Sequence, residues 1–138
     1  SKRLMVTYSS KQGIMRYFTA LFCIISLLSF SFSDTEKGSA SYYSSSMNGR
    51  KTSSGEIFNN NLLTAAHKSM KLGTMVKVTN IKNDSTVVLK VNDRLSKSSS
   101  HVIDVTLAAA KKLNFVRNGI ATVTVEVLST TNEDTKQH

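Results

Sequence analysis

Short stretches of alternating apolar and polar residues recur between residues 75 and 128 of this chain. Over residues 75–80, Val76 and Val78 alternate with polar neighbours, and over residues 121–128 valines occupy every second position. A period of two places the apolar side chains on one face of a β-strand. The pattern therefore predicts strands at both places.

Turn signals define the remaining elements. Residues 86–91 (TVVLKV) predict a strand after a turn at Asn83 and Asp84, so residues 75–91 are expected to form a hairpin. Residues 102–105 predict a further short strand, and residues 34–55 have the composition of short strands and ordered loops.

One helix is predicted at residues 107–113, with Thr106 as its N-cap and Leu107, Ala110 and Leu113 on one side. The chain has no proline, so glycine and asparagine must make its tight turns. Five or six short strands and one helix indicate a mainly β domain, a small barrel, over residues 34–128. Residues 129–138 are expected to form a polar tail.

The N-terminal part of the chain has a different character. Residues 17–32 carry no charge, Arg16 precedes them, and Ser31 and Ser33 supply small residues before the next segment. This arrangement predicts that residues 1–33 are an N-terminal extension and signal peptide. The alternative is a membrane anchor that is not cleaved.

An export signal implies that the domain works outside the cytoplasm, in the periplasm, in the cell envelope or beyond it. Cys23 lacks the small residue that a lipoprotein signal places before its cysteine, so a lipid anchor is not expected. Met15 is an alternative start. Because Cys23 is the only cysteine, a disulfide within the chain and an all-cysteine metal site are excluded. Membrane contact is expected only through an uncleaved signal, and the domain is expected to be a monomer.

The net charge of +9 is unevenly distributed. Residues 1–33 hold four basic residues and no acid, and residues 34–138 hold 14 basic and 9 acidic residues, which leaves +5. Phe115 is the only aromatic residue after Phe58, so the chain lacks the stacking platform of a nucleic-acid binder. A mildly basic surface suits an anionic wall polymer, although a solvated surface explains it equally well.

Three acids of the domain are candidates for chemistry. Asp104 lies in an apolar strand just before the helix, so its carboxyl is expected to be partly buried, as suits a proton donor. The alternative is a structural carboxylate near the helix N-terminus. For Asp93 the residues alone favour an ion pair with Arg94 or a turn cap, and Glu56 can be a solvated loop acid.

The histidines and serine runs give weaker signals. His67 lies on an apolar approach to a loop, where a single histidine is more often a structural residue than a base. His101 and His138 add no metal-ligand spacing, so neither a metal nor a cofactor is expected. The serines at 44–46 and 98–100 have no neighbouring base and predict loops.

Nine segments in order resemble the rare lipoprotein A (RlpA) family. They are Gly38-Ser-Ala-Ser-Tyr-Tyr43, Asn48-Gly-Arg-Lys-Thr52, Ser54-Gly-Glu56, Leu63-Thr-Ala-Ala-His-Lys68, Leu72-Gly-Thr74, Val76-Lys-Val-Thr-Asn80, Val91-Asn-Asp-Arg94, Ile103-Asp-Val-Thr106 and Ala108-Ala-Ala110. The resemblance implies a small six-stranded double-psi β-barrel with one or two short helices, as in expansins. It also implies an endolytic transglycosylase that acts on peptidoglycan, with a preference in characterised relatives for glycan strands stripped of stem peptides.

A lytic transglycosylase uses the C6 hydroxyl of its own substrate as nucleophile, so one acid/base can serve both steps. The resemblance implies that role for Asp104, with Asp93 and Glu56 as further family acids and His67 as the family histidine. Tyr42, Tyr43, Arg50, Asn92 and Arg94 are the implied substrate-binding residues. For the two tyrosines, packing within the barrel is an equal alternative to stacking on a sugar ring.

Three segments depart from the family pattern. Residues 42–44 read Tyr-Tyr-Ser where the family usually has Trp-Tyr-Gly, and Leu95-Ser-Lys-Ser-Ser follows Arg94 where it usually has Gly-Pro-Phe. Lys71 stands where a proline is common. The altered loop favours the alternative function, a non-catalytic, expansin-like wall-binding or wall-loosening module. A purely structural envelope protein is the third hypothesis.

Overall fold

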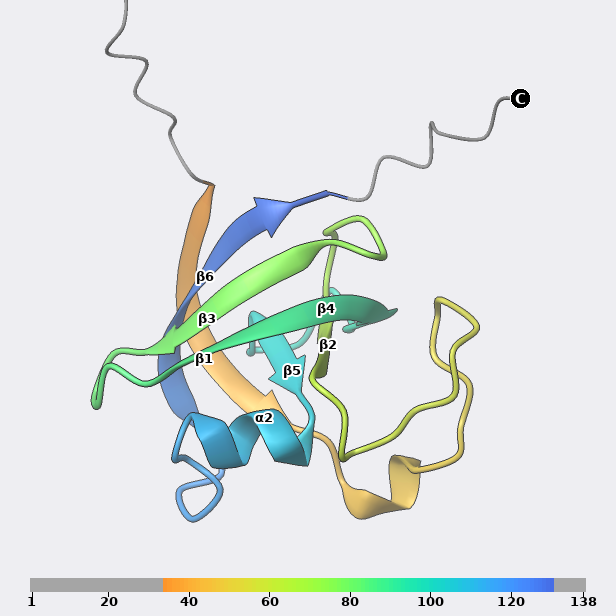
Figure 1. Ribbon diagram of the computed structural model, residues 1–138, viewed down its shortest axis with the longest axis horizontal. Coiled ribbons are helices and arrows are strands. Elements are labelled where there is room, and N and C mark those ends of the chain that lie inside the picture. The colour runs from red at the N-terminus through yellow and green to blue at the C-terminus, as the bar shows by residue number, and fades with distance from the viewer. Residues whose placement is uncertain (1–33, 131–138) are drawn as a thin grey trace, which may run out of the picture. The chain divides into compact units, whose positions relative to one another are not determined.

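The computed structural model describes residues 34–130 (Figure 1). The predicted signal peptide at residues 1–33 and residues 131–138 of the predicted tail lie outside this part of the chain. The elements in chain order are β1 (Thr35–Tyr42), the 3-10 turn η1 (Ser45–Met47), β2 (Thr64–His67), β3 (Met75–Asn80), β4 (Thr86–Arg94), β5 (Ile103–Val105), α2 (Leu107–Lys112) and β6 (Ala121–Ser129).

The strands close into a barrel in the order β1-β5-β2-β4-β3-β6. Two neighbouring pairs, β1 with β5 and β2 with β4, are parallel, and the other pairs are antiparallel. Closure gives every strand a hydrogen-bonded neighbour on both sides, so no strand edge of the described barrel is left open. The mainly β barrel expected from the sequence is confirmed.

The hairpin predicted at residues 75–91 is present as β3 and β4, whose register pairs Val78 with Val87. Its turn contains Asp84 with a φ of 59°, a left-handed conformation that aspartate tolerates. Strand β4 continues to Arg94, three residues beyond the predicted end, because it also pairs with β2.

The predicted helix appears as α2, with Thr106 as N-cap accepting a hydrogen bond from the amide of Ala109. In Figure 1 the helix lies at one end of the barrel, below β5. Ala109, Ala110 and Leu113 are fully buried and belong to the core. That core is filled mainly by β-branched side chains of the strands, among them Val76, Val78, Val91, Ile103, Val105, Val123 and Val125.

Sequence reasoning missed β2 and the full length of β1. All four residues of β2 are buried, so the strand lacks the polar-apolar alternation that marks a half-buried strand. Strand β1 carries Glu36, Lys37 and a run of small residues, which gave no periodic signal. Both strands form because the barrel supplies their hydrogen-bonding partners.

Candidate active site

A row of four residues crosses four adjacent strands of the barrel. Ser41 of β1 pairs with Asp104 of β5, Asp104 pairs with Ala66 of β2, and Ala66 pairs with Asp93 of β4. Asp104 lies between the fully buried Ile103 and Val105, so its side chain leaves the strand on the face away from the core. We call Ser41, Asp104, Ala66 and Asp93 the acid row.

Ala66 separates the two aspartates of the acid row and carries only a methyl group. Adjacent strands lie about 4.8 Å apart, so the backbones of Asp104 and Asp93 are about 9.6 Å apart across β2. The residue between them therefore places no side chain larger than a methyl between the two carboxyls. A pair of carboxylates with space between them is the arrangement from which glycosidic bonds are attacked.

A β-bulge sets which residue of β4 enters the row. Ala65 pairs with Val91, but the next residue, Ala66, pairs with Asp93, so Asn92 is the extra residue of β4. Asn92 is 3% exposed, and its carbonyl accepts a hydrogen bond from the amide of Ser54.

Asp93 is held by four hydrogen-bond donors. The Tyr43 hydroxyl donates to Oδ2 at 2.7 Å, and Oδ1 accepts from the amide and hydroxyl of Ser53 and from the amide of Arg94, each at 2.9 Å. Partial burial raises the pKa of Asp93, but the hydrogen bonds from Tyr43, Ser53 and the backbone outweigh it and hold the pKa below its ordinary value. Asp93 is therefore a carboxylate at neutral pH, and both of its oxygens already accept hydrogen bonds.

Tyr43 binds Asp93 and feels the charge of both acids. Burial, its hydrogen bond to Asp93 and the negative charges of Asp93 and Asp104 raise the pKa of Tyr43 well above its ordinary value, so the hydroxyl remains a donor. The tyrosine ring also packs against Phe58, with ring centroids 4.4 Å apart and planes inclined at 45°. Tyr43 thus belongs to the site through its hydroxyl.

Asp104 is bound more lightly than Asp93. Its carboxyl accepts a hydrogen bond at Oδ1 from the Ser41 hydroxyl. Its side chain is half-buried, as the sequence predicted. Of the two aspartates, Asp104 is therefore the one with a carboxyl oxygen free to meet a ligand.

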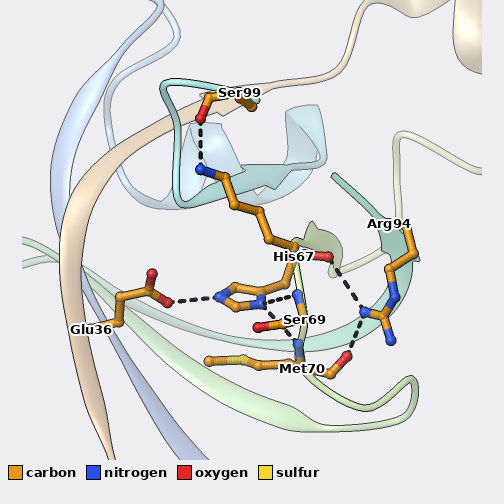
Figure 2. Close-up of polar contacts among 7 residues, drawn as sticks. Glu36, His67, Ser69, Met70, Arg94 and Ser99 are labelled. Atoms are coloured by element: carbon orange, nitrogen blue, oxygen red, sulfur yellow. Dashed lines mark hydrogen bonds and ion pairs between the residues drawn. The ribbon is translucent and has the colours of Figure 1, made fainter. Parts of the chain in front are cut away.

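His67 lies on the other side of β2 from the acid row. Because it follows Ala66, its side chain leaves the strand on the opposite face, where Nε2 lies 2.7 Å from Oε2 of Glu36 (Figure 2). Nδ1 accepts hydrogen bonds from the amides of Ser69 and Met70 at 3.1 and 3.0 Å. An Nδ1 that accepts twice requires the proton on Nε2, so His67 is anchored as a donor to Glu36.

The loop that His67 holds in turn fixes Arg94. Nη1 of Arg94 donates to the carbonyl oxygens of Met70 and His67, at 2.5 and 3.4 Å, and Figure 2 shows the guanidinium between them. On the same loop, the Lys68 ammonium donates to the carbonyl of Ser99 at 2.6 Å. The ion pair between Asp93 and Arg94 that the sequence left open is not formed, since the guanidinium binds these carbonyls.

Glu56 forms an ion pair with Lys90, with Oε1 and Nζ 2.8 Å apart. The pair lies beside an open hollow of about 660 Å³, which we call the basic hollow. Its lining consists of Ser53, Ser54, Glu56, Lys71, Leu72, Gly73, Lys90 and Arg94. Because Ser53 lines the hollow and also binds Asp93, the basic hollow adjoins the acid row.

The other predicted substrate-binding residues lie in different environments. Tyr42 packs against Phe115 with ring centroids 5.9 Å apart and donates its hydroxyl to the carbonyl of Val116 at 3.0 Å, so its contacts are those of barrel packing. Arg50 is exposed in the loop after η1, and its backbone is hydrogen-bonded within that loop. The structure thus brings together Asp104, Asp93 and Tyr43 and leaves Tyr42 outside the group.

Sequence reasoning missed three residues of the site: Ser41, Ser53 and Glu36. Ser41 and Ser53 lie in or next to segments of the family resemblance, and Glu36 lies two residues before the first of them. Serines and a glutamate near a strand start nevertheless carry no local signal. Only the pairing of β1 with β5 places Ser41 beside Asp104. Within residues 34–130, no cluster of three or more His, Cys, Asp or Glu side chains is placed to hold a metal ion. Over the same residues no helix has the length and apolar character needed to cross a membrane.

Comparison with known proteins gives a consistent result. Residues 35–125 match the family described as "Lytic transglycolase". The chain is 47% identical over 92 residues to the endolytic peptidoglycan transglycosylase RlpA of Neisseria meningitidis serogroup A, which covers 67% of this chain and 38% of that protein. It is 45% identical over 102 residues to the protein of the same name from Rickettsia bellii, with 72% of this chain and 45% of that protein covered. The chain therefore spans less than half the length of these relatives.

Solved structures share the fold at low sequence identity. The Streptomyces papain inhibitor has a TM-score of 0.58 at 19% identity, covering 70% of this chain and 96% of that one. A point mutant of the Clavibacter michiganensis expansin, in complex with cellohexaose, has a TM-score of 0.57 at 20% identity, covering 70% and 51%. These similarities show the double-psi barrel alone. With a family match over nearly all of the described barrel and identities above 40%, the chain belongs to the RlpA-like lytic transglycolase family.

Proposed function

We propose that this chain is an endolytic peptidoglycan lytic transglycosylase. It cleaves the β-1,4 bond between N-acetylmuramic acid (MurNAc) and N-acetylglucosamine (GlcNAc) and leaves 1,6-anhydro-MurNAc ends. The observation that carries the proposal is the unequal bonding of the two carboxyls in the acid row. Asp93 accepts four hydrogen bonds, three of them at Oδ1, whereas Asp104 is bound through one hydroxyl.

In this mechanism Asp104 is the acid and then the base. The protonated carboxyl of Asp104 gives its proton to the glycosidic oxygen, which leaves as O4 of GlcNAc while the bond to C1 of MurNAc breaks. The C6 hydroxyl of the same MurNAc then attacks C1 from within the sugar, and its proton passes to Asp104. The carboxyl ends protonated, as it began, and no water is consumed.

Asp93 serves as a fixed negative charge. Its lowered pKa keeps it ionised when the sugar develops positive charge at C1, and such a preorganised charge stabilises that state without rearranging. Tyr43 keeps the carboxylate in place from one side and Ser53 from the other. His67 contributes as a positioning residue through the loop that binds Arg94, and Glu56 through its pair with Lys90.

We propose peptidoglycan glycan strands, with a preference for strands stripped of stem peptides, as the substrate, and an exported location for the domain. The substrate class is supported by the names of the relatives at 47% and 45% identity. The export proposal is supported by the uncharged run at residues 17–32, which follows Arg16. Neither metal nor cofactor takes part in the proposed steps.

The test is to incubate the chain with stripped and with intact peptidoglycan and to identify the products by mass spectrometry. We expect 1,6-anhydro-muramyl ends from the unaltered chain and a loss of at least about 100-fold in rate for Asp104→Asn, the size of a general acid's contribution. Asp84→Asn is the matched control, because it makes the same change in the exposed β3–β4 turn. It should leave the rate unchanged.

Two results would contradict the proposal in different ways. Reducing-end MurNAc would mean that water is the nucleophile, which makes the reaction a hydrolysis and assigns Asp93 as second carboxylate. Binding to the wall without release of sugar would instead favour the expansin-like, non-catalytic alternative. A rate for Asp104→Asn equal to that of Asp84→Asn would exclude Asp104 as the acid.

A further inference from the structure

The basic hollow carries an excess of positive charge that its own residues do not neutralise. Three cations, Lys71, Lys90 and Arg94, line it together with one carboxylate, Glu56. The carboxylate of Glu56 is paired with the ammonium of Lys90, with Oε1 and Nζ 2.8 Å apart. Two of the three cations are therefore left without an acidic partner among the residues of the barrel that the structure describes.

Arg94 is oriented before any ligand arrives. The two side-chain hydrogen bonds that it makes within residues 34–130 both use Nη1, which the carbonyls of Met70 and His67 fix (Figure 2). A guanidinium carries five donors in a rigid planar fork suited to a carboxylate, so the unused donors form a ready anion site. The His67 ring, by holding the amide of Met70, secures that orientation.

Lys71 is the next residue on the loop that holds Arg94. Its backbone carbonyl is bound by the amide and hydroxyl of Thr74, at 3.1 and 2.5 Å, so the start of its side chain is fixed. Its ammonium makes no ion pair with another described residue, and the side chain lines the hollow. Lys71 and Arg94 therefore present two unneutralised cations to the same hollow.

We infer that the basic hollow is a carboxylate subsite, in which Lys71 and Arg94 bind the carboxylate of a muramyl unit of the glycan. The inference rests on the proposed function, because it assumes that a glycan lies on the acid row. Ser53 lines the hollow and donates to Asp93, so a sugar at the row has its substituents next to these cations. The lactyl group of MurNAc is attached to the ring and ends in a carboxylate.

That carboxylate exists only where the stem peptide has been removed, because the peptide converts it to a neutral amide. Lys71 would then be a specificity-determining residue that favours stripped strands over intact ones. The carboxylates within a stem peptide are the other source of the same chemistry. If the lactyl group is the source, loss of the Lys71 charge weakens binding of stripped strands; if the stem peptide is the source, it weakens binding of intact strands.

The experiment measures binding of Lys71→Gln and of the unaltered chain, at low salt, to three glycan preparations. The first is stripped strands, the second is stripped strands whose lactyl carboxylates have been converted to methylamides, and the third is intact strands with stem peptides. Lys77→Gln is the matched control, since Lys77 is exposed on β3 and does not line the hollow. Lys71→Arg tests whether charge alone restores binding.

We expect Lys71→Gln to weaken binding of stripped strands about two- to fivefold, the range of an exposed ion pair, and to leave the amidated strands unchanged. Lys71→Arg should restore the affinity, and added salt should remove the difference between variants. A loss confined to intact strands would support the carboxylate subsite with the stem peptide as its source. Equal affinities of the Lys71→Gln and Lys77→Gln variants for all three preparations would overturn the inference.

Failure of the inference and failure of the proposed function are separable. If the chain forms anhydro-muramyl products but binds methylamidated and unmodified strands equally well, the transglycosylase proposal stands and the carboxylate subsite is wrong. If the chain binds stripped strands in a charge-dependent way but releases no product, the carboxylate subsite stands and the transglycosylase proposal is wrong. Binding and product formation are therefore measured on the same preparations.

Discussion

At the carboxyl of Asp93, four donors from three residues converge, and the least expected of them is the hydroxyl of Tyr43. Burial alone would favour the neutral acid, but the donors reverse the effect and lower the pKa. A carboxylate prepared in this way is suited to carrying a constant charge, and a poor choice for exchanging a proton. The different roles proposed for Asp93 and Asp104 therefore follow from their hydrogen bonds rather than from residue type.

Tyr43→Phe tests this arrangement through its pH dependence. A lowered folded-state pKa stabilises the protein above the ordinary pKa of 3.8, and the contribution is lost as the pH falls through the folded value. Removing the hydroxyl should lower the free energy of unfolding by about 1 kcal/mol at pH 7. The difference from the unaltered chain should shrink below about pH 4, as measured by urea unfolding on both sides of that value.

Tyr42→Phe is the matched control for that measurement. It removes a hydroxyl that donates to the neutral carbonyl of Val116, so its cost should be the same at neutral and at acid pH. If Tyr43→Phe also lowered the free energy of unfolding by the same amount at neutral and at acid pH, the tyrosine hydroxyl would not be stabilising the ionised form of Asp93.

Among the elements, β1 depends on Gly38 for its approach to β5. A Cβ added to Gly38 would collide with the side chain of Val102, at the entrance to β5. The pairing of these two parallel strands also sets Ser41 beside Asp104. The absence of a side chain at Gly38 is thus a condition for building one end of the acid row.

Gly38→Ala should lower the free energy of unfolding by about 1–3 kcal/mol, because an added methyl in a packed contact forces its neighbours to move. Combining it with Val102→Ala should recover part of the loss, which a double-mutant cycle by chemical denaturation would measure. Strictly additive costs would indicate that Val102 is not the group that meets the methyl. Gly119→Ala is not a suitable control, because its φ of 75° adds backbone strain.

At the scale of the whole barrel, closure joins the strands into one cooperative unit. The loop from η1 to β2 lies outside these ladders, and its tip at residues 53–56 is joined to β4 through Ser53 and Ser54. Strands β3, β4 and β6 carry fully buried valines and Leu89, together with ladders on both sides. Their amides can exchange with solvent only when the barrel opens as a whole. The loop can open by itself.

Hydrogen exchange in native conditions should therefore give two classes of amide. Amides of β3 and β4, such as those of Val78 and Leu89, should exchange at a rate set by global unfolding, and amides of the exposed loop segment at residues 53–56 should exchange at least about 100-fold faster. Mass spectrometry with peptide resolution checks this expectation. Comparable rates in both regions would mean that the barrel opens strand by strand.

The sequence was sufficient for elements whose signal is local. The β3–β4 hairpin, helix α2 and its Thr106 cap follow from periodicity and capping chemistry within a few residues. Strand β2 was not predictable, because Ala65 and Ala66 are buried by partners distant in the sequence. The resemblance to the family gave Asp93 and Asp104 as candidates, but the contacts that distinguish the two acids, from Ser41 and Ser53, depend on strand pairing.

Because β4 contains a bulge, the chemistry proposed for the acid row depends on the register in which β4 pairs with β2. Either Asn92 or Asp93 can pair with Ala66, depending on the register of β4 against β2, and in this structure Asp93 does. A slip of one residue, confined to the end of β4, would put an amide of nearly the same shape where the carboxylate belongs. Such a molecule would still be folded and compact, but it would carry no negative charge opposite Ala66. If the proposed activity is present, the specific activity of refolded protein would then measure the fraction of molecules in which β4 has formed the register seen here.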